Sequence, residues 1–153
     1  MEKNYIKWLR SKVGHEKVML IFTGGIVYDK TGKIILQKRS DFKKWGFPGG
    51  AIELNETPEE AAIREIKEET KLNVKITNLF GIYSDDNMEY PNGDLAHSIC
   101  IVYEMEIING MIQADNDETL ELQFFEIDKL PSMFCKQHEE IKLDLQTKYK
   151  MEK

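Results

Sequence analysis

The chain has 153 residues, is 41% hydrophobic and carries 27 acidic against 21 basic side chains, a formal net charge of −6. This length supports one hydrophobic core, so we expect a single domain over residues 1–153. The acidic balance argues against broad binding to nucleic acids or anionic membranes, although a small phosphorylated molecule stays possible.

Targeting and redox features are sparse. No apolar run approaches the roughly 18 residues that a membrane-spanning helix needs. The two cysteines, Cys100 and Cys135, lack the spacing of a zinc site or of a disulfide framework. We therefore expect a soluble, cytoplasmic protein with two reduced thiols.

The first expected element is a short amphipathic helix over about residues 3–12. Its apolar side chains recur at roughly helical spacing: Tyr5, Ile6, Trp8 and Leu9. An exposed strip of this kind would be costly to leave in water. It therefore favours packing on the domain or the formation of a homodimer.

Two β-rich segments follow, residues 18–28 and 33–38, and the turn between them predicts a hairpin. The stretch 45–50, Trp-Gly-Phe-Pro-Gly-Gly, is too rich in Gly and Pro for a helix. It predicts a shaped loop.

The second half of the chain predicts mostly strands. We expect them at about 74–83, 99–103 and 120–125. The polar segment 84–97 contains Pro, Asn and Gly and is a candidate substrate loop. A charged helix over about 136–149 closes the chain. Strands before, between and after helices indicate a mixed α/β domain.

The helix expected over residues 58–70 has the clearest local signals. Thr57 is a good N-cap, Pro58 suits the first helical position, and Glu60 completes a capping box. This segment therefore begins at a defined residue, directly after the Gly-rich loop.

Three carboxylates share one face of this helix, at positions i, i+3 and i+4: Glu65, Glu68 and Glu69. Such like charges destabilise a helix by a few tenths of a kcal/mol per pair, roughly. A solvated acidic face is one interpretation. The cluster, however, borders the apolar side of the helix and follows a Gly-Gly loop whose backbone could approach a ligand. An all-oxygen site suits Mg²⁺ or Mn²⁺.

The segment from Gly50 to Leu72 resembles the Nudix box, the signature motif of the Nudix hydrolase family. Eight of its nine fixed positions match over 23 residues: Gly50, Glu56, Arg64, Glu65, Ile66, Glu68, Glu69 and Leu72. The departure is Lys71, where the motif has a Gly at a helix end that often needs left-handed backbone. We expect this change to cost about 1 kcal/mol of stability without loss of chemistry.

The resemblance implies an α/β/α sandwich around a mixed sheet, with a loop-helix-loop motif that carries the catalytic residues. It implies metal-dependent cleavage of a phosphoanhydride bond in a nucleoside-diphosphate-linked substrate, with Mg²⁺ or Mn²⁺ as cofactor. The implied metal ligands are Glu65, Glu68, Glu69 and the main-chain carbonyl of Gly49. Glu56 and Arg64 would aim these ligands.

Residues outside the box are assigned more loosely. A further metal-binding carboxylate is expected near the start of the 120–125 strand, with Glu121 ranked above Glu118. Lys38 and Arg39 are candidates for phosphate contacts, and Trp45 and Gly50 for other substrate contacts. Trp45, Tyr83 and Tyr90 are candidates for stacking on a base. His15, His97 and His138 show no ligand spacing and are expected on the surface or in loops.

The substrate stays open at this stage. The box is common to enzymes that act on ADP-ribose and other diphosphate sugars, nucleoside triphosphates, dinucleoside polyphosphates or capped RNA. A non-catalytic Nudix-like domain that senses a nucleotide is an alternative, although such domains often lose box carboxylates. A plain acidic α/β protein would bind no metal specifically. The expected partners are a small-molecule nucleotide and a second copy of the chain.

Overall fold

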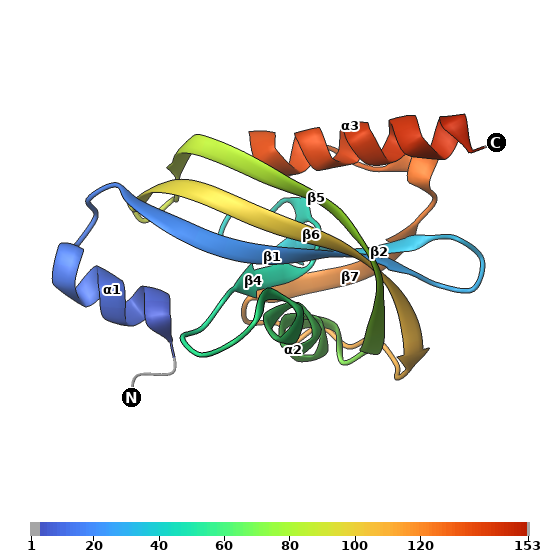
Figure 1. Cartoon of the computed structure of the whole chain (residues 1–153), viewed down its shortest axis with the longest axis horizontal. Coiled ribbons are helices and arrows are strands. Elements are labelled where there is room, and N and C mark those ends of the chain that lie inside the picture. Colours follow the sequence, from blue (N-terminus) through green and yellow to red (C-terminus); the bar gives the residue numbers. More distant parts are fainter. Residues whose placement is uncertain (1–3, 153) are drawn as a thin grey trace.

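The computed structural model describes residues 4–152. Figure 1 shows its elements, which follow in this order: α1 (Tyr5–Val13), β1 (Val18–Tyr28), β2 (Ile34–Arg39), β3 (Trp45–Gly46), β4 (Gly49–Ala51), α2 (Pro58–Thr70), β5 (Asn73–Glu89), β6 (Leu95–Asn109), β7 (Thr119–Phe125), the 3₁₀ turn η1 (Ile127–Lys129) and α3 (Lys136–Met151). None of the helices in this described part of the chain is long and apolar enough to cross a membrane.

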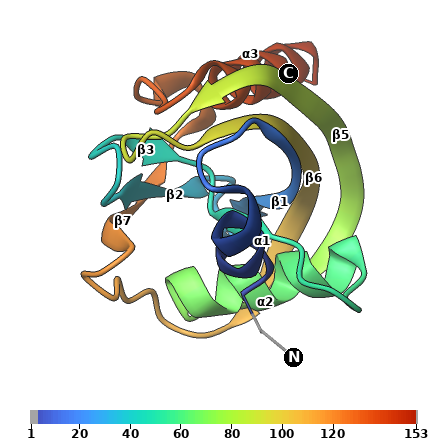
Figure 2. The ribbon, with the colours of Figure 1, turned by 90° about the vertical axis from the view of Figure 1, so that its left-hand side faces the viewer.

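The strands form one mixed sheet. Its order is β3-β2-β1-β6-β5, with β4 paired to β1 and β7 paired to β2. β1 runs parallel to β6 and antiparallel to β2 and β4. Helices α2 and α3 cover opposite faces of the sheet (Figures 1 and 2). The predicted α/β/α arrangement is confirmed.

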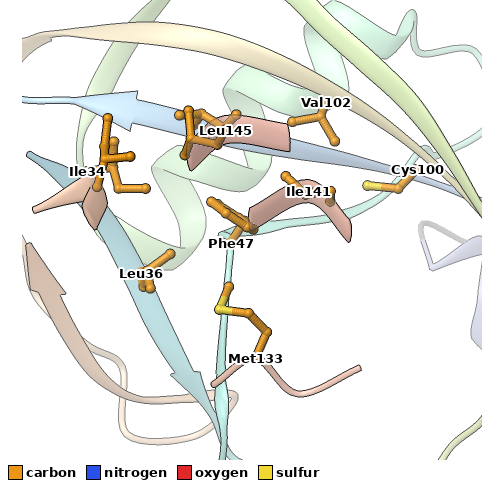
Figure 3. Packing of buried hydrophobic residues seen from close by; sticks show 10 residues of the cluster. Ile34, Leu36, Phe47, Cys100, Val102, Met133, Ile141 and Leu145 are labelled. Atoms are coloured by element: carbon orange, nitrogen blue, oxygen red, sulfur yellow. The ribbon is translucent and has the colours of Figure 1, made fainter. Parts of the chain in front are cut away.

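Two apolar clusters hold the layers together. The cluster beneath α3 includes Phe47 from the Gly-rich loop and Ile141 and Leu145 from α3 (Figure 3). The cluster beneath α2 includes Ile66, which is fully buried. Burial of each such side chain contributes about 1.5 to 3 kcal/mol. The Gly-rich loop is therefore packed on the α3 face of the sheet, and α2 is packed on the opposite face.

Helix α2 begins as predicted. The Thr57 hydroxyl accepts the N–H of Glu60 at 3.1 Å, and the Glu60 carboxylate accepts the N–H of Thr57 at 3.0 Å. The helix ends at Lys71, whose φ of 71° and ψ of 9° are left-handed. A non-glycine residue therefore occupies the conformation that the motif usually gives to Gly.

Lys71→Gly is expected to raise the free energy of unfolding by about 1 kcal/mol, because Gly adopts positive φ without steric cost. The bond that Lys71 Nζ donates to the Glu68 carbonyl at 2.9 Å is exposed, so its loss offsets little of this gain. Urea denaturation followed by circular dichroism measures the change. Lys67→Gly, within the same helix, is the matched control and should lose about 1 kcal/mol. Equal losses in both variants would contradict the explanation.

The prediction of a long polar loop over 84–97 is wrong. β5 continues to Glu89 and β6 begins at Leu95, so only the turn 90–94 separates them. The N–H of Tyr90 donates to the Asp94 carbonyl at 2.9 Å, which closes the turn. The pairing of β5 with β6 contains several register shifts. Polar side chains are accepted here because the ladder satisfies the backbone while one face meets water.

Helix α1 is confirmed from Tyr5, and the predicted start at residue 3 lies outside the described residues. Ile6 and Leu9 pack against the small cluster of Leu20, Met88 and Ala96. Trp8 is 43% exposed and stacks on Tyr5. Ile6 and Leu9 are therefore partly covered by the chain itself, whereas Trp8 stays exposed to solvent.

Candidate active site

A cavity of about 1030 Å³ opens between α2, the Gly-rich loop, the β5–β6 turn and α1. Five glutamates of the segment from Gly50 to Leu72 line this cavity: Glu53, Glu56, Glu65, Glu68 and Glu69. Its volume is at the upper end of the range for small-molecule sites, about 300 to 1000 Å³. The structure therefore brings the predicted carboxylates to a ligand-sized space.

Glu69 is the most enclosed of these carboxylates, with 8% of its surface exposed. Its Oε1 accepts the N–H of Gly49 at 3.0 Å. Burial, followed by the nearby charge of Glu65, raises the pKa of Glu69 well above its usual value. Burial also raises the pKa of Glu65, although Arg64 opposes the shift. The raised pKa values of these two adjacent carboxylates indicate that too little positive charge surrounds them.

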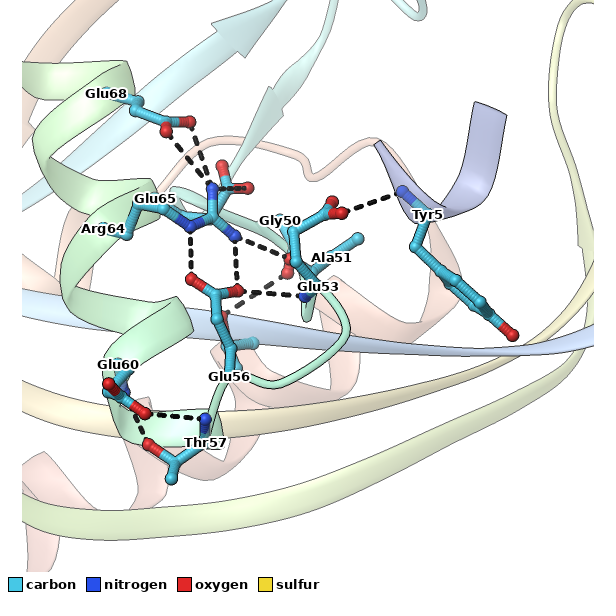
Figure 4. A network of polar contacts seen from close by, with 11 residues as sticks. Tyr5, Gly50, Ala51, Glu53, Glu56, Thr57, Glu60, Arg64, Glu65 and Glu68 are labelled. Atoms are coloured by element: carbon cyan, nitrogen blue, oxygen red, sulfur yellow. Dashed lines mark hydrogen bonds and ion pairs between the residues drawn. The ribbon is translucent and has the colours of Figure 1, made fainter. Parts of the chain in front are cut away.

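Arg64 is the cation that organises the box (Figure 4). It holds Glu56 through two bonds, from Nε at 2.5 Å and from Nη2 at 2.8 Å. Nη2 also donates to the carbonyl of Ala51 at 3.1 Å. Nη1 reaches Glu65 at 2.9 Å and Glu68 at 3.2 Å. One planar guanidinium therefore holds the carbonyl of Ala51 and three box carboxylates together.

Two glycines allow the loop to approach the carboxylates. A Cβ on Gly50 would lie 2.4 Å from the carboxyl carbon of Glu65. A Cβ on Gly49 would lie 2.1 Å from the carbonyl oxygen of Thr23, on the neighbouring strand. Any side chain at these positions would push the loop or Glu65 away.

Of the two candidates for phosphate contacts, Arg39 lies at the cavity and Lys38 does not. Arg39 lines the cavity and pairs with Asp41 through bonds of 3.0 and 2.7 Å, and its guanidinium lies 4.2 Å from the centre of the Phe134 ring. Lys38 points the other way, since neighbours on a strand face opposite sides. Its Nζ lies 3.9 Å from Glu121, outside the cavity.

The two candidates for a further metal-binding carboxylate also differ in whether they line the cavity. Glu118 lines the cavity, whereas the Glu121 side chain is 57% exposed beside Lys38. Trp45 also lies outside the cavity, and its ring packs edge-on against Phe125 at 5.1 Å. Tyr90 lines the cavity, while Tyr83 does not and donates to Asp144 at 2.7 Å.

His138 contradicts the expectation that all three histidines lie on the surface or in loops. It is buried in α3, and its Nδ1 accepts the N–H of Phe47 at 3.1 Å. Burial, with Arg39 nearby, lowers its pKa to about 3, so the imidazole is neutral at physiological pH. It supports the Gly-rich loop from the α3 side and lines the cavity.

Within residues 4–152, no three His, Cys, Asp or Glu side chains are grouped as a ready metal-binding set. The bonds from Arg64 explain this, because they draw Glu65 and Glu68 toward the guanidinium. The donors that remain along this wall are carboxylate and carbonyl oxygens. Their chemistry suits a hard divalent cation better than zinc.

This fold and site define a class of α/β/α domains in which an acidic loop-helix-loop lines a ligand cavity. The family described as NUDIX domain matches residues 22–145. The chain therefore belongs to the Nudix hydrolase family.

Known relatives agree with this assignment, and a solved structure shares the fold. An ADP-ribose pyrophosphatase of Methanocaldococcus jannaschii is 38% identical over 138 residues, which cover 86% of this chain and 79% of the relative. A putative 8-oxo-dGTP diphosphatase of Bacillus subtilis is 34% identical over 106 residues, 69% of this chain and 66% of the relative. The fold of a MutT protein from Methanosarcina mazei Go1 matches with a TM-score of 0.71 at 18% identity, over 88% of this chain and 98% of that one.

Proposed function

We propose that this Nudix hydrolase cleaves the phosphoanhydride bond of a nucleoside diphosphate linked to a further group, with ADP-ribose as the first candidate substrate. The main observation behind this proposal is that the buried Glu69 and the partly buried Glu65 line a cavity large enough for such a molecule. The similarity to the archaeal ADP-ribose pyrophosphatase supports the choice of substrate.

We also propose Mg²⁺ or Mn²⁺ as cofactor. The residues fit such an ion, because the box presents oxygen donors and two carboxylates with too little compensating charge. Glu65, Glu68, Glu69 and the Gly49 carbonyl would hold it. A bound divalent ion would polarise a phosphoryl oxygen and lower the pKa of a bound water.

The chain's own residues then have separate tasks. Arg64 and Glu56 keep the box carboxylates aimed at the cavity, and Glu65 is a candidate to accept the proton of the attacking water. Arg39 and the loop at Gly50 are proposed to contact phosphate oxygens. Because Glu118 lines the cavity and Glu121 does not, we propose Glu118 as the further carboxylate.

The test is release of phosphate and nucleotide, with Mg²⁺ and then Mn²⁺, across a substrate panel. The panel contains ADP-ribose, other diphosphate sugars, nucleoside triphosphates including 8-oxo-dGTP, dinucleoside polyphosphates and capped RNA. Hydrolysis of ADP-ribose that EDTA abolishes would support the proposal. Preference for 8-oxo-dGTP would favour the second candidate function, which the bacillar relative motivates. Silence across the panel, with metal bound, would favour nucleotide sensing.

The stabilising effect of Mg²⁺ is expected to grow with pH. The pKa values of Glu65 and Glu69 are raised in the folded protein, so their contribution to stability is present below the usual glutamate pKa and is lost as pH rises through the raised values. A divalent ion favours the ionised form and offsets this loss. Melting temperatures with and without Mg²⁺, from about pH 5 to about pH 8, measure the effect. A gain in melting temperature that does not depend on pH would mean that the ion binds away from Glu65 and Glu69.

We further propose that residues 1–153 act as one domain in the cytoplasm. Both cysteines are free thiols, which agrees with a reducing compartment.

A further inference from the structure

Helix α1 lies outside the range that the family matches, residues 22–145, yet it borders the active-site cavity. Its N-cap Asn4 and its residues Ile6 and Arg10 line that cavity. In Figure 2, α1 stands in front of the curled sheet, between α2 and the ends of the long strands. The cavity is therefore completed by a segment outside the residues that the family model matches.

Each end of α1 is attached to a different border of the cavity. At its start, the N–H of Tyr5 donates to Glu53 Oε2 at 2.8 Å (Figure 4). This bond joins a helix N-terminus to a carboxylate, which the helix dipole favours. Toward its end, Arg10 donates to the carbonyls of Leu95 and Glu16, both at 2.6 Å. α1 therefore connects the box loop to the start of β6.

Between these attachments α1 is weakly packed. None of its residues is fully buried. Within residues 4–152, the Nε of Arg10 is the buried side-chain atom left without a hydrogen bond, and its ion-pair partner, the Asp94 carboxylate, lies 3.5 Å away. Few buried contacts and an unsatisfied donor are properties of segments that open at low cost.

Glu53 also connects α1 to the box. Its carboxylate accepts the bond from Tyr5, while its own backbone N–H donates to Glu56 Oε1 at 2.9 Å. Glu56 in turn holds Arg64. The attachment of α1 is therefore built on the same loop that positions the box.

We propose that α1 is a lid over the active-site cavity, latched by the Tyr5 N–H and Glu53, which closes over the part of the substrate beyond the scissile diphosphate. The nature of that substrate rests on the proposed function. The cavity volume of about 1030 Å³ exceeds what a diphosphate alone would fill, so the nucleoside or sugar end has room beneath α1. Opening of α1 admits the substrate, and closing removes it from water.

The test compares Glu53→Gln with the control Glu89→Gln, an exposed carboxylate at the end of β5. Glutamine keeps the backbone bond to Glu56 but loses the charge that strengthens the Tyr5 bond. Hydrogen exchange, read by mass spectrometry, is expected to speed up by roughly three- to tenfold over residues 5–13 in Glu53→Gln alone. In the wild type, the non-hydrolysable probe α,β-methylene ADP-ribose with Mg²⁺ should slow exchange over the same residues.

Kinetics separates a latch from a merely structural role. Glu53→Gln should raise KM for the hydrolysed nucleotide by a similar factor, with kcat changed by less than about twofold. A fall in kcat at unchanged KM would overturn the lid and reassign Glu53 to orienting Arg64. Exchange over 5–13 that ignores the bound probe, or that matches in the two variants, would also overturn it.

Failure of the proposed function can be told apart from failure of the lid. The wild type would then hydrolyse no member of the nucleotide panel with either metal. The exchange of residues 5–13 in the free Glu53→Gln and Glu89→Gln proteins would still decide whether Glu53 latches α1.

Discussion

Glu69→Gln is expected to lower turnover of the proposed substrate, ADP-ribose, by at least about a hundredfold while raising the melting temperature at neutral pH. Turnover falls because glutamine removes a charged oxygen from the proposed metal site. Stability rises because the pKa of Glu69 is raised by burial, so that ionising it at neutral pH works against folding. A neutral glutamine avoids that cost and still accepts the N–H of Gly49.

Steady-state kinetics and thermal unfolding of the same preparation measure both effects. Glu106→Gln is the matched control, because this carboxylate is 58% exposed on β6 and lies outside the cavity. It should change turnover by less than about twofold. Wild-type turnover in Glu69→Gln would refute the metal-site assignment, and a lower melting temperature would refute the electrostatic explanation.

Gly50→Ala is expected to reduce kcat by about a hundredfold or more with a loss of stability below about 2 kcal/mol. The added Cβ would lie 2.4 Å from the carboxyl carbon of Glu65. A side-chain end can move aside more cheaply than backbone, so folding survives. Glu65 nevertheless leaves the position that Arg64 gives it.

Gly24→Ala is the control, since its Cβ would meet Cys100 Sγ at 3.4 Å, an ordinary contact. It should keep most of the activity. Both variants are compared by kcat, by KM and by urea denaturation. An active Gly50→Ala enzyme would mean that the position of Glu65 is unimportant for catalysis.

Local sequence signals predicted the box helix because its causes are local. The cap at Thr57, the proline after it and the spacing of the three glutamates act within a few residues, and they fixed the start and the acidic face of α2. The same holds for β1, whose predicted bounds are those observed. The prediction failed for the long polar ends of β5 and β6. These ends are stabilised by pairing with each other, which no local sequence pattern reports.

The sequence by itself therefore determined the class of this protein, an acidic helix with a box motif in a mixed α/β chain. Only the tertiary structure decided which outlying side chains share the cavity. It brought in Arg39 and Glu118, left Lys38 and Glu121 outside, and buried His138 against the Gly-rich loop. The physical reason is that these positions depend on which face a strand or helix presents after packing, a choice made by contacts between residues far apart in the chain.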